Sequence, residues 1–502
     1  MPVPLLLRLL DPLVILFWLV ALTLGSLKLS GALPGRRHAS RTPEDVLDAH
    51  RSLPAWAICL SIVATETSTL TVISVPGIAY GQGMVFVGLG GGYLLGRLVV
   101  ARYLLPLYMR GDLASAYQYL ALRFGRRMQR LASVTFLLTR LLAEAVRLFA
   151  STIPICALLV AHGVGLSPFS VLLGLTVLTA FYTAIGGLRA VVWSDAAQFL
   201  LYTAGAALCA ALLWRHLTPE QLAALPASGH LLPFALHVPA LTSPYAPLTA
   251  LIGGAVLAMA SHGTDQLMVQ RALAARTLRD AQRAMVGSAV VVTLLFALLS
   301  LVGVFLWARA SGAPLATLGL SSPDELFPRF IVSDLPPGLS GLLVAGIISA
   351  TMGSLSSALN AMTASTFTDL FGVTRPSCRA VASGVTALWA AALIAVACAF
   401  SSSSRSVLLF GFQITGYSYG ALLGAFLLGL LCRKVSEPVA MIAFFTTVLV
   451  MALLITFVHP GGKTIAFPWL VPMGVAVTFS VGLPLSALEA WRKKLRAKRE
   501  AS

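Results

Sequence analysis

Long apolar segments, separated by short polar connections that often carry arginine, run through the whole chain. They are long enough for α-helices that cross the hydrocarbon core of a membrane, which takes about 18 residues or more. The pattern predicts an all-α membrane protein with about 13 transmembrane helices. The predicted segments are residues 10–30, 53–80, 83–108, 128–161, 167–187, 190–214, 247–269, 284–310, 338–370, 379–401, 406–431, 436–457 and 468–490.

The composition supports this prediction. Of the 502 residues, 58% are hydrophobic and 11% are charged, and the mean hydropathy is +0.88. An ordinary soluble domain has about 25% charged residues. Lys28, Arg36 and Arg37 follow the first segment, and no small-residue cleavage site is evident, so we expect an anchor helix rather than a cleaved signal peptide.

Basic residues divide unequally between the two sets of connections. About twenty-three of them, including Arg271 and the tail after residue 490, fall on one side, against about six on the other. The positive-inside rule then predicts an extracellular N-terminus and a cytoplasmic C-terminus in a plasma membrane. We interpret the net charge of +17 as orientation and attraction to membrane lipid rather than as nucleic-acid binding.

One predicted segment carries a run of hydroxyl side chains, SIVATETSTLTVISVPGIAYGQG at 61–83. Hydroxyls compete with the helix for backbone hydrogen bonds, and an unwound turn at membrane depth occurs only where it lines protein or a cavity. Carbonyl groups freed there can coordinate a cation. The alternative is a tight helix interface in which the hydroxyls bond to carbonyls of their own helix.

A second polar segment, GIISATMGSLSSALNAMTASTFTDLF at 346–371, places Ala350, Ser354 and Ser357 on one helix face. Hydroxyl and carbonyl oxygens are hard ligands of the kind that hard cations such as Na⁺ favour. The alternative is a packing seam of small residues against another helix.

Asp195 is the single acid in the apolar stretch TAIGGLRAVVWSDAAQFLL at 183–201. A carboxylate inside a membrane segment is expected to face the protein interior and to mark an ion or proton route. Alternatively, it caps the helix that begins after Gly186 and Gly187.

Sites for ATP or for enzyme chemistry are not evident. GLGGG at 88–92 lacks the Lys-Ser/Thr of a phosphate-binding loop, and no nucleophile–base or metal constellation is present. We therefore expect that the protein is not an enzyme and acts within its helix bundle.

Four motifs, in order, resemble the sodium/solute symporter family: ATETSTLTVISVPGIAY (64–80), AIGGLRAVVWSDAAQFLLY (184–202), GTDQLMVQRALAARTLRDAQRA (263–284) and ISATMGSLSSALNAMTASTFTDLF (348–371). The resemblance implies a leucine-transporter-type fold with two inverted five-helix repeats, at 53–214 and 247–431. Residues 1–52 would add an N-terminal helix, 215–246 an extracellular loop, and 432–502 two C-terminal helices and a basic tail.

In that fold, the first helix of each repeat is interrupted near the membrane midplane, where substrate and ion bind. Two stretches favour such breaks independently: Ser61–Thr71 in the first repeat, and Gly253-Gly254 with the polar run 261–265 in the second.

The resemblance also implies sodium ligands. One Na⁺ would be held by Ala64, Thr67, Ala350, Gly353 and Ser354, although relatives often have a hydroxyl where this chain has Gly353. Some relatives hold a second Na⁺, for which the matching residues are Asp195, Ser356 and Ser357.

Substrate contacts are predicted at Ser68 and Thr71, which match substrate-facing positions of relatives. Glu66 and Arg147 are further candidates because an amine or a carboxylate of a solute could pair with them. Alternatively, Glu66 pairs with Arg140 or Arg147 and joins two helices, and Arg140, Glu144 and Arg147 form an intrahelical network. Gln82 and Gln413 are additional pocket candidates.

These observations predict a sodium-coupled symporter that imports a small polar organic solute by alternating access. A proton-coupled symporter, with Asp195 or Glu66 titrating, and a transporter-like membrane sensor are the alternatives. The solute, the choice between one and two sodium ions, and the oligomeric state stay open.

Overall fold

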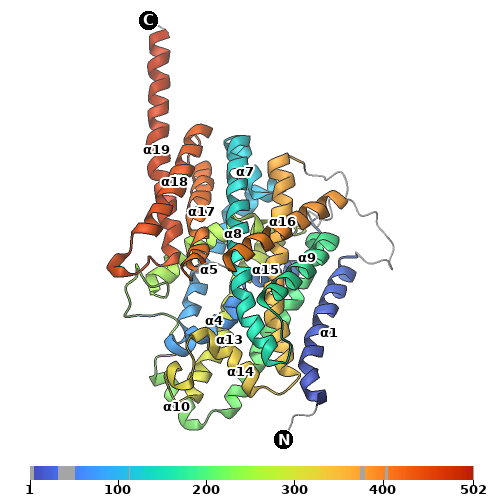
Figure 1. Cartoon of the computed structure of the whole chain (residues 1–502). Helices are drawn as coiled ribbons and strands as arrows, with labels where there is room; N and C mark the ends of the chain where they lie inside the picture. The colour runs from blue at the N-terminus through green and yellow to red at the C-terminus, as the bar shows by residue number, and fades with distance from the viewer. Residues whose placement is uncertain (1–4, 32–50, 112, 374–378, 402–404, 501–502) are drawn as a thin grey trace.

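The computed structural model describes residues 5–31, 51–111, 113–373, 379–401 and 405–500, without the side chains of residues 5–8, 379, 401 and 405–414. Its described part is a bundle of helices (Figure 1) with one isolated β-bridge, between Leu53 and Ala275. The main helices are α1 (Leu5–Leu29), α3 (Ala55–Glu66), α4 (Thr69–Gln82), α5 (Val87–Val99), α6 (Leu105–Arg110), α7 (Ala116–Arg123), α8 (Arg126–Ala161), α9 (Pro168–His216), α10 (Pro219–Ala227), α11 (Gly254–Gly263), α12 (Gln266–Leu273), α13 (Leu278–Arg309), α14 (Leu326–Asp334), α15 (Leu339–Ser365), α16 (Arg379–Ser401), α17 (Arg405–Leu431), α18 (Glu437–Phe457) and α19 (Phe467–Glu500).

Within the described ranges, nine helices are long and apolar enough to cross a membrane, or ten if the bent pair α3–α4 counts as one span. The apolar helix Thr249–Gly263 falls below that length, whereas α17 has 27 residues, of which Thr415–Leu431 have described side chains. The all-helical prediction is therefore confirmed, while the count of thirteen spans stays a prediction.

The predicted segments 167–187 and 190–214 form one continuous element, α9, with a kink between them. At the kink, Gly187 has φ 59° and ψ −161°, a conformation that residues with a Cβ rarely adopt. The Gly186-Gly187 pair therefore redirects the helix shortly before Asp195 rather than ending it.

The helices pack in three groups. In the first, α13 lies against α3, α4 and α5, and α11 lies against α5. In the second, α15 packs along α9, α16 packs on α8 and α9, and α1 covers α9 and α15. In the third, α17, α18 and α19 pack together. Contacts of α3 with α9 and of α8 with α17 join the groups, and the candidate site lies where α3, α9, α12 and α15 meet.

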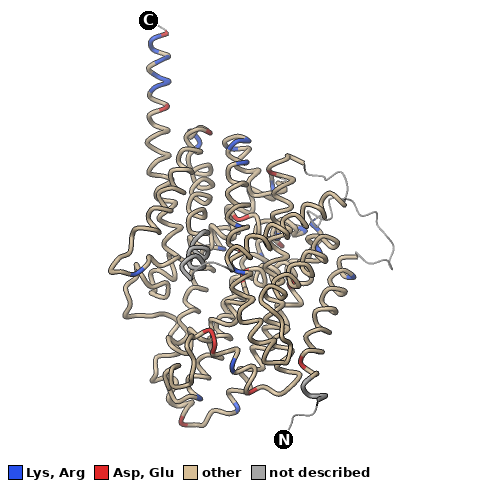
Figure 2. Tube along the Cα trace, in the orientation of Figure 1, with Lys and Arg blue, Asp and Glu red and all other residues tan. Residues whose placement is uncertain are grey.

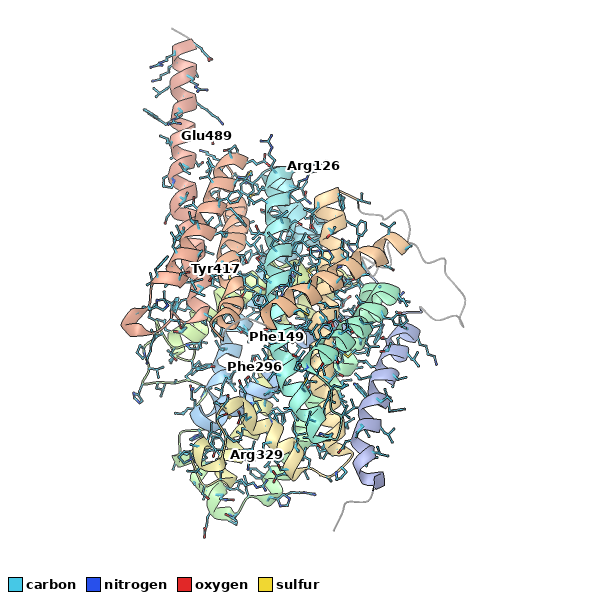
Figure 3. The ribbon with its side chains drawn as sticks, in the orientation of Figure 1. Arg126, Phe149, Phe296, Arg329, Tyr417 and Glu489 are labelled. Carbon is cyan, nitrogen blue, oxygen red and sulfur yellow. The ribbon has the colours of Figure 1, made fainter. Side chains whose placement is uncertain are left out.

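The two ends of the bundle differ in charge. The N- and C-termini lie at opposite ends (Figure 1), and Lys and Arg gather at the end that carries the C-terminus (Figure 2). Arg126 and Glu489 are near that end, whereas Arg329 is near the other (Figure 3). This polarity is the three-dimensional counterpart of the asymmetry in the sequence.

Candidate functional site

The first hydroxyl-rich segment is broken. Helix α3 ends at Glu66, α4 begins at Thr69, and the two are bent by 70°. Thr67 (φ −86°, ψ 107°) and Ser68 (φ −94°, ψ 168°) between them are extended. The Thr67 N–H makes the last bond, to the Val63 carbonyl at 2.9 Å, so the carbonyl groups after Val63 have no partner within α3. The predicted interruption is confirmed.

The second predicted interruption is present at the polar run 261–265, whereas Gly253 and Gly254 have helical backbone angles, so that part of the prediction is wrong. Helix α11 ends at Gly263 and α12 begins at Gln266. Asp265 is the N-cap of α12, and its carboxylate accepts a hydrogen bond from the Leu267 N–H at 2.9 Å. The same carboxylate is paired with Arg140 of α8 and accepts a hydrogen bond from the Tyr419 hydroxyl at 2.6 Å. Both breaks therefore lie at buried polar contacts between helices.

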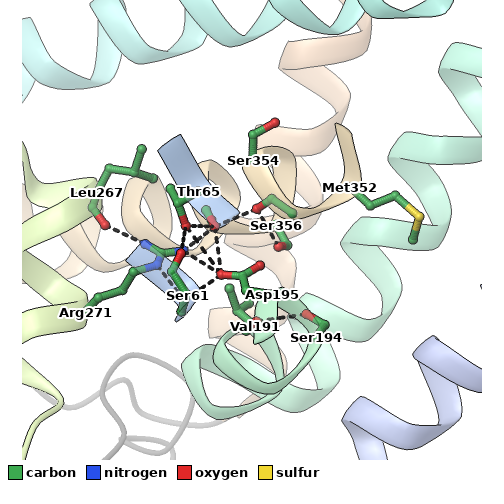
Figure 4. A network of polar contacts seen from close by, with 12 residues as sticks. Ser61, Thr65, Val191, Ser194, Asp195, Leu267, Arg271, Met352, Ser354 and Ser356 are labelled. Atoms are coloured by element: carbon green, nitrogen blue, oxygen red, sulfur yellow. Dashed lines mark hydrogen bonds and ion pairs between the residues drawn. The ribbon is translucent and has the colours of Figure 1, made fainter. Parts of the chain in front are cut away.

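Asp195 is fully buried, and its Oδ2 atom is the centre of a polar network (Figure 4). Ser61 donates to Oδ2 at 2.7 Å, and Thr65 donates at 3.4 Å. Ser357 of α15 lies at 3.5 Å. Since Asp195 stands two turns after the Gly187 kink and bonds to other helices, the helix-cap alternative is wrong.

The fourth partner of Asp195 is Arg271, whose Nη2 lies 3.4 Å from Oδ2. The Arg271 guanidinium also donates to the Ser61 hydroxyl at 2.9 Å, to the Leu267 carbonyl and to the Ser357 hydroxyl. Arg271 is fully buried. The sequence analysis counted Arg271 with the connections between spans, but it lies inside the short helix α12 and pairs with a buried carboxylate.

The other oxygen of Asp195, Oδ1, faces Gly353. A Cβ at Gly353 would lie 2.5 Å from the Gln198 Oε1 atom and 3.4 Å from Asp195 Oδ1. Asp195 Oδ1, both amide atoms of Gln198 and the Thr67 hydroxyl are buried without a hydrogen-bond partner among the described residues. Unpaired buried oxygens are costly, so this arrangement suits a cation or ordered water.

The residues predicted to bind a first Na⁺ lie on α15 and at the end of α3, two helices that contact each other. Ala64 and Thr67 lie in the last turn and break of α3, and Ala350, Gly353 and Ser354 lie on buried turns of α15. The Ser354 hydroxyl donates to the Thr351 carbonyl at 3.1 Å and is turned away from Asp195 (Figure 4).

The residues predicted to bind a second Na⁺ already form hydrogen bonds with other groups of the protein. The Ser356 hydroxyl donates to the Gly353 carbonyl at 3.0 Å, and the Ser357 hydroxyl donates to the same carbonyl at 2.6 Å. Ser357 and Asp195 also contact Arg271, as described above.

Glu66 pairs with Arg97 of α5, which is fully buried and also donates to Ser288 at 2.7 Å. His262 Nε2 lies 3.8 Å from the Glu66 carboxylate. The expected pairing of Glu66 with Arg140 or Arg147 is therefore wrong, because Arg140 is held by Asp265. The carboxylate of Glu66 remains 16% exposed.

The network within α8 is confirmed. Glu144 lies 3.0 Å from Arg140 and 3.2 Å from Arg147. Arg140 and Glu144 are buried, whereas the Arg147 side chain is 28% exposed. Part of the Arg147 guanidinium therefore remains accessible.

The remaining substrate candidates are dispersed. Ser68 and Thr71 adjoin the first break, and their hydroxyls are 3.4 Å apart. Gln82 is exposed at the far end of α4, about 20 Å along the helix from the break. The Gln413 side chain lies outside the described part of the chain. Gln82 therefore does not join the other candidates.

A cavity of about 800 Å³ lies between α4, α8 and α14. Leu70 and Ser74 of α4 line it, just after the first break, and so does Ala150, one turn beyond Arg147 on α8. Glu325 lines its outer part, where hydrogen bonds from Ser321 hold the pKa of that carboxyl below its ordinary value. The cavity thus runs along α8, which carries Arg147, and along α4, which follows Glu66 and the first break.

Sequence reasoning missed Arg97, Asp265 and Gln198 and misplaced Arg271. The signal for Arg97 was available, since a lone arginine inside an apolar segment requires an acidic partner. Gln198 lies three residues after Asp195 and so shares its helix face.

Comparison with known proteins supports the fold. Residues 47–446 match the model of the sodium:solute symporter family. The human sodium/iodide cotransporter is 29% identical over 80% of this chain and 63% of its own length. The rabbit sodium-dependent multivitamin transporter is 29% identical over 81% of this chain and 65% of its own length. The matched part of this chain thus spans less than two thirds of these relatives.

A solved structure of a Na⁺-coupled sialic acid symporter, substrate-bound and outward-open, has a TM-score of 0.82 and 22% identity. It covers 95% of this chain and 98% of its own chain. The named relatives are membrane transporters and not enzymes. With a family match that spans most of its length, this chain belongs to the sodium:solute symporter family.

Proposed function

We propose that the protein is a sodium-coupled symporter that imports a small polar organic solute across the plasma membrane by alternating access. The observation that carries this proposal is the pair of helix breaks, α3–α4 and α11–α12, each at buried polar contacts between helices. Interrupted helices in corresponding positions of two repeats are the best structural pointer to a transporter's binding site.

The proposed sodium site lies beside the first break. Carbonyl groups of Ala64, Thr67 and Ala350, together with Gly353 and the Ser354 hydroxyl, supply hard oxygen ligands. We add Gln198, whose Oε1 occupies the space that a hydroxyl-bearing side chain at position 353 would take. Bound there, Na⁺ supplies a positive charge that links the first break to α15.

Alternating access needs two groups of helices that can move against each other. The repeats 53–214 and 247–431 would each contribute to both groups: α3, α4, α5, α11 and α13 on one side, and α8, α9, α15 and α16 on the other. Since the proposed sodium site joins α3 to α15, occupying it favours one arrangement of the groups, and solute and ion then strengthen each other's binding.

The solute would bind between the breaks and the cavity along α4 and α8. Ser68, Thr71, Glu66 and Arg147 are the proposed contacts. Relatives carry iodide, vitamins and sialic acid by name, so membership of the family does not select a solute class. The orientation follows from charge: the arginine-rich end with the C-terminus would be cytoplasmic, and the N-terminus extracellular.

Reconstituted vesicles test the proposal. Purified protein is reconstituted into the membrane of liposomes, and an inward sodium gradient is imposed. Uptake is then measured for labelled amino acids, monocarboxylates, sugars, nucleosides and vitamins added outside. Each Na⁺ that crosses 100 mV contributes about 2.3 kcal/mol, so the transported solute should accumulate against its gradient. The proposal would be contradicted if uptake were the same with an inward sodium gradient as with equal Na⁺ concentrations on both sides of the membrane. It would also be contradicted if none of the solutes accumulated.

A proton-coupled symporter is the second candidate. The absence of a hydroxyl at Gly353 and the buried Asp195 favour it. In that case, accumulation would persist in sodium-free buffer when an inward pH gradient is imposed, and it would not respond to Na⁺.

A further inference from the structure

The contacts of Arg271 bear on how many sodium ions the protein binds. We infer that the Arg271 guanidinium occupies the place of a second cation beside Asp195, Ser356 and Ser357, so that the protein couples to one sodium ion. This inference rests on the proposed function, because it concerns the stoichiometry of the same transport cycle.

The guanidinium contacts the oxygens that a second cation would need. Its Nη2 atom donates to the Ser357 hydroxyl and lies 3.4 Å from Asp195 Oδ2. Its Nε atom donates to the Ser61 hydroxyl at 2.9 Å. A second cation at this place would therefore have to displace hydrogen bonds to two of its three ligands.

The guanidinium is held in position from its own helix. Its Nη1 atom donates to the Leu267 carbonyl, one turn earlier in α12. Arg271 and Asp195 are both fully buried. The charge at this place is therefore fixed by the fold rather than delivered by an exposed, mobile side chain.

The serine hydroxyls also point to this arrangement. Ser356 and Ser357 both give their protons to the Gly353 carbonyl, at 3.0 and 2.6 Å. The acceptor side of Ser357 is then taken by Arg271, and the hydrogen-bond partners of Asp195 among the described residues are Ser61, Thr65, Arg271 and Ser357 rather than Ser356. The two adjacent serines thus serve the helix and the arginine.

Charge balance also favours a single sodium ion. Asp195 is one negative charge, and Arg271 neutralises it. The next acid of this region, Asp265 at the other end of α12, is paired with Arg140. A sodium ion added beside Arg271 would have to share one carboxylate with it, against like-charge repulsion.

The two oxygens of Asp195 therefore have different roles. Oδ2 binds Arg271 and the hydroxyls of α3, whereas Oδ1 faces Gln198 and Gly353, beside the first sodium site. Asp195 thus links the sodium site to α12.

Sodium binding to purified protein tests the inference without knowledge of the solute. Radioactive ²²Na⁺ is titrated against wild type, Arg271→Lys and Arg271→Met, and the unfolding temperature is measured in Na⁺ and in K⁺. Wild type should bind about one Na⁺ with a Hill coefficient of about 1. Arg271→Lys keeps the charge and should also bind one.

Arg271→Met keeps the length of the side chain but leaves Asp195 unpaired. It should bind a second Na⁺, raise the Hill coefficient toward about 2, and depend on Na⁺ for its stability. If it does not fold even in high sodium, Asp195→Asn combined with Arg271→Met removes both charges and should fold. This double variant should bind no more than one Na⁺.

The results separate the two proposals. Two Na⁺ bound by wild type, a second Na⁺ bound by the double variant, or a single Na⁺ bound by folded Arg271→Met would overturn the inference while leaving sodium coupling intact. A wild-type protein that binds no Na⁺ would overturn the proposed function, and this inference with it.

Discussion

At the scale of single residues, Gly353 decides how the candidate sodium site is built. Relatives often have a hydroxyl where this chain has Gly353, and the sequence alone suggested a missing ligand. The structure places the Gln198 amide in that space, 2.5 Å from where a Cβ would stand. In the proposed site, Gln198 of α9 would take the place of a ligand from α15.

Gly353→Ala should therefore push the Gln198 amide away from the site. We expect the affinity for Na⁺ to fall about tenfold or more, as for other changes that displace groups around a bound metal. Isothermal titration with Na⁺ measures this effect.

The double variant Gly353→Ser with Gln198→Ala provides the control. The serine hydroxyl then has room, so part of the affinity should return. If Gly353→Ala binds Na⁺ as wild type does, Gln198 has no part in the site.

At the scale of secondary-structure elements, the kink of α9 depends on Gly187. Its φ of 59° lies in a region that disfavours any residue with a Cβ. Gly187→Ala should therefore cost about 1–3 kcal/mol of stability. Thermal unfolding in detergent measures the loss.

Gly174→Ala is the matched control on the same helix. Gly174 is helical and has open space around its Cα, so alanine should be neutral or stabilise by about 0.5–1 kcal/mol. Equal effects at the two positions would show that the kink imposes no strain on residue 187.

The N-terminus of α8 is capped from another helix. Glu437, in the first turn of α18, accepts hydrogen bonds from the Arg127 and Met128 N–H groups at 3.0 and 3.2 Å. A carboxylate at this place accepts hydrogen bonds from N–H groups that have no partner within α8, and its negative charge interacts favourably with the positive end of the helix dipole.

Glu437→Ala should lower stability by about 1 kcal/mol. Glu500→Ala, at the exposed end of α19, should have no effect. An unchanged unfolding temperature for Glu437→Ala would mean that the contact contributes nothing.

The positions of both helix breaks could be predicted from the sequence. The hydroxyl run at 61–71 and the polar run at 261–265 predicted both breaks, because side chains that compete for backbone bonds weaken helices locally. The partners of Glu66 and Asp195 could not be predicted, because pairing depends on which helices pack together. Arg271 follows an apolar segment, so the positive-inside rule counted it with the connections and gave no sign of its burial beside Asp195.

At the scale of the whole molecule, the distribution of charge predicts orientation. In a variant without its native cysteines, Ala227→Cys in α10 and Ala497→Cys in α19 lie near opposite ends of the bundle. In intact cells, an impermeant maleimide should label the cysteine at position 227 but not the one at position 497. The cysteine at position 497 should be labelled only after the membrane is permeabilised. The reverse pattern would invert the assignment of the two faces.

The central claim is that Na⁺ bound at the first break joins it to α15. A ligand that binds the folded state alone stabilises it by about 2.7 kcal/mol at 100 times its Kd. The unfolding temperature is measured in Na⁺, K⁺ and choline for wild type, Ser354→Ala and Ser349→Ala. Ser349 lies on the same helix but bonds to Trp18.

We expect Na⁺ alone to stabilise wild type and Ser349→Ala, and to have little effect on Ser354→Ala. The account would be contradicted if K⁺ or choline raised the unfolding temperature as much as Na⁺ does. It would also be contradicted if Na⁺ raised the unfolding temperature of Ser354→Ala as much as that of wild type.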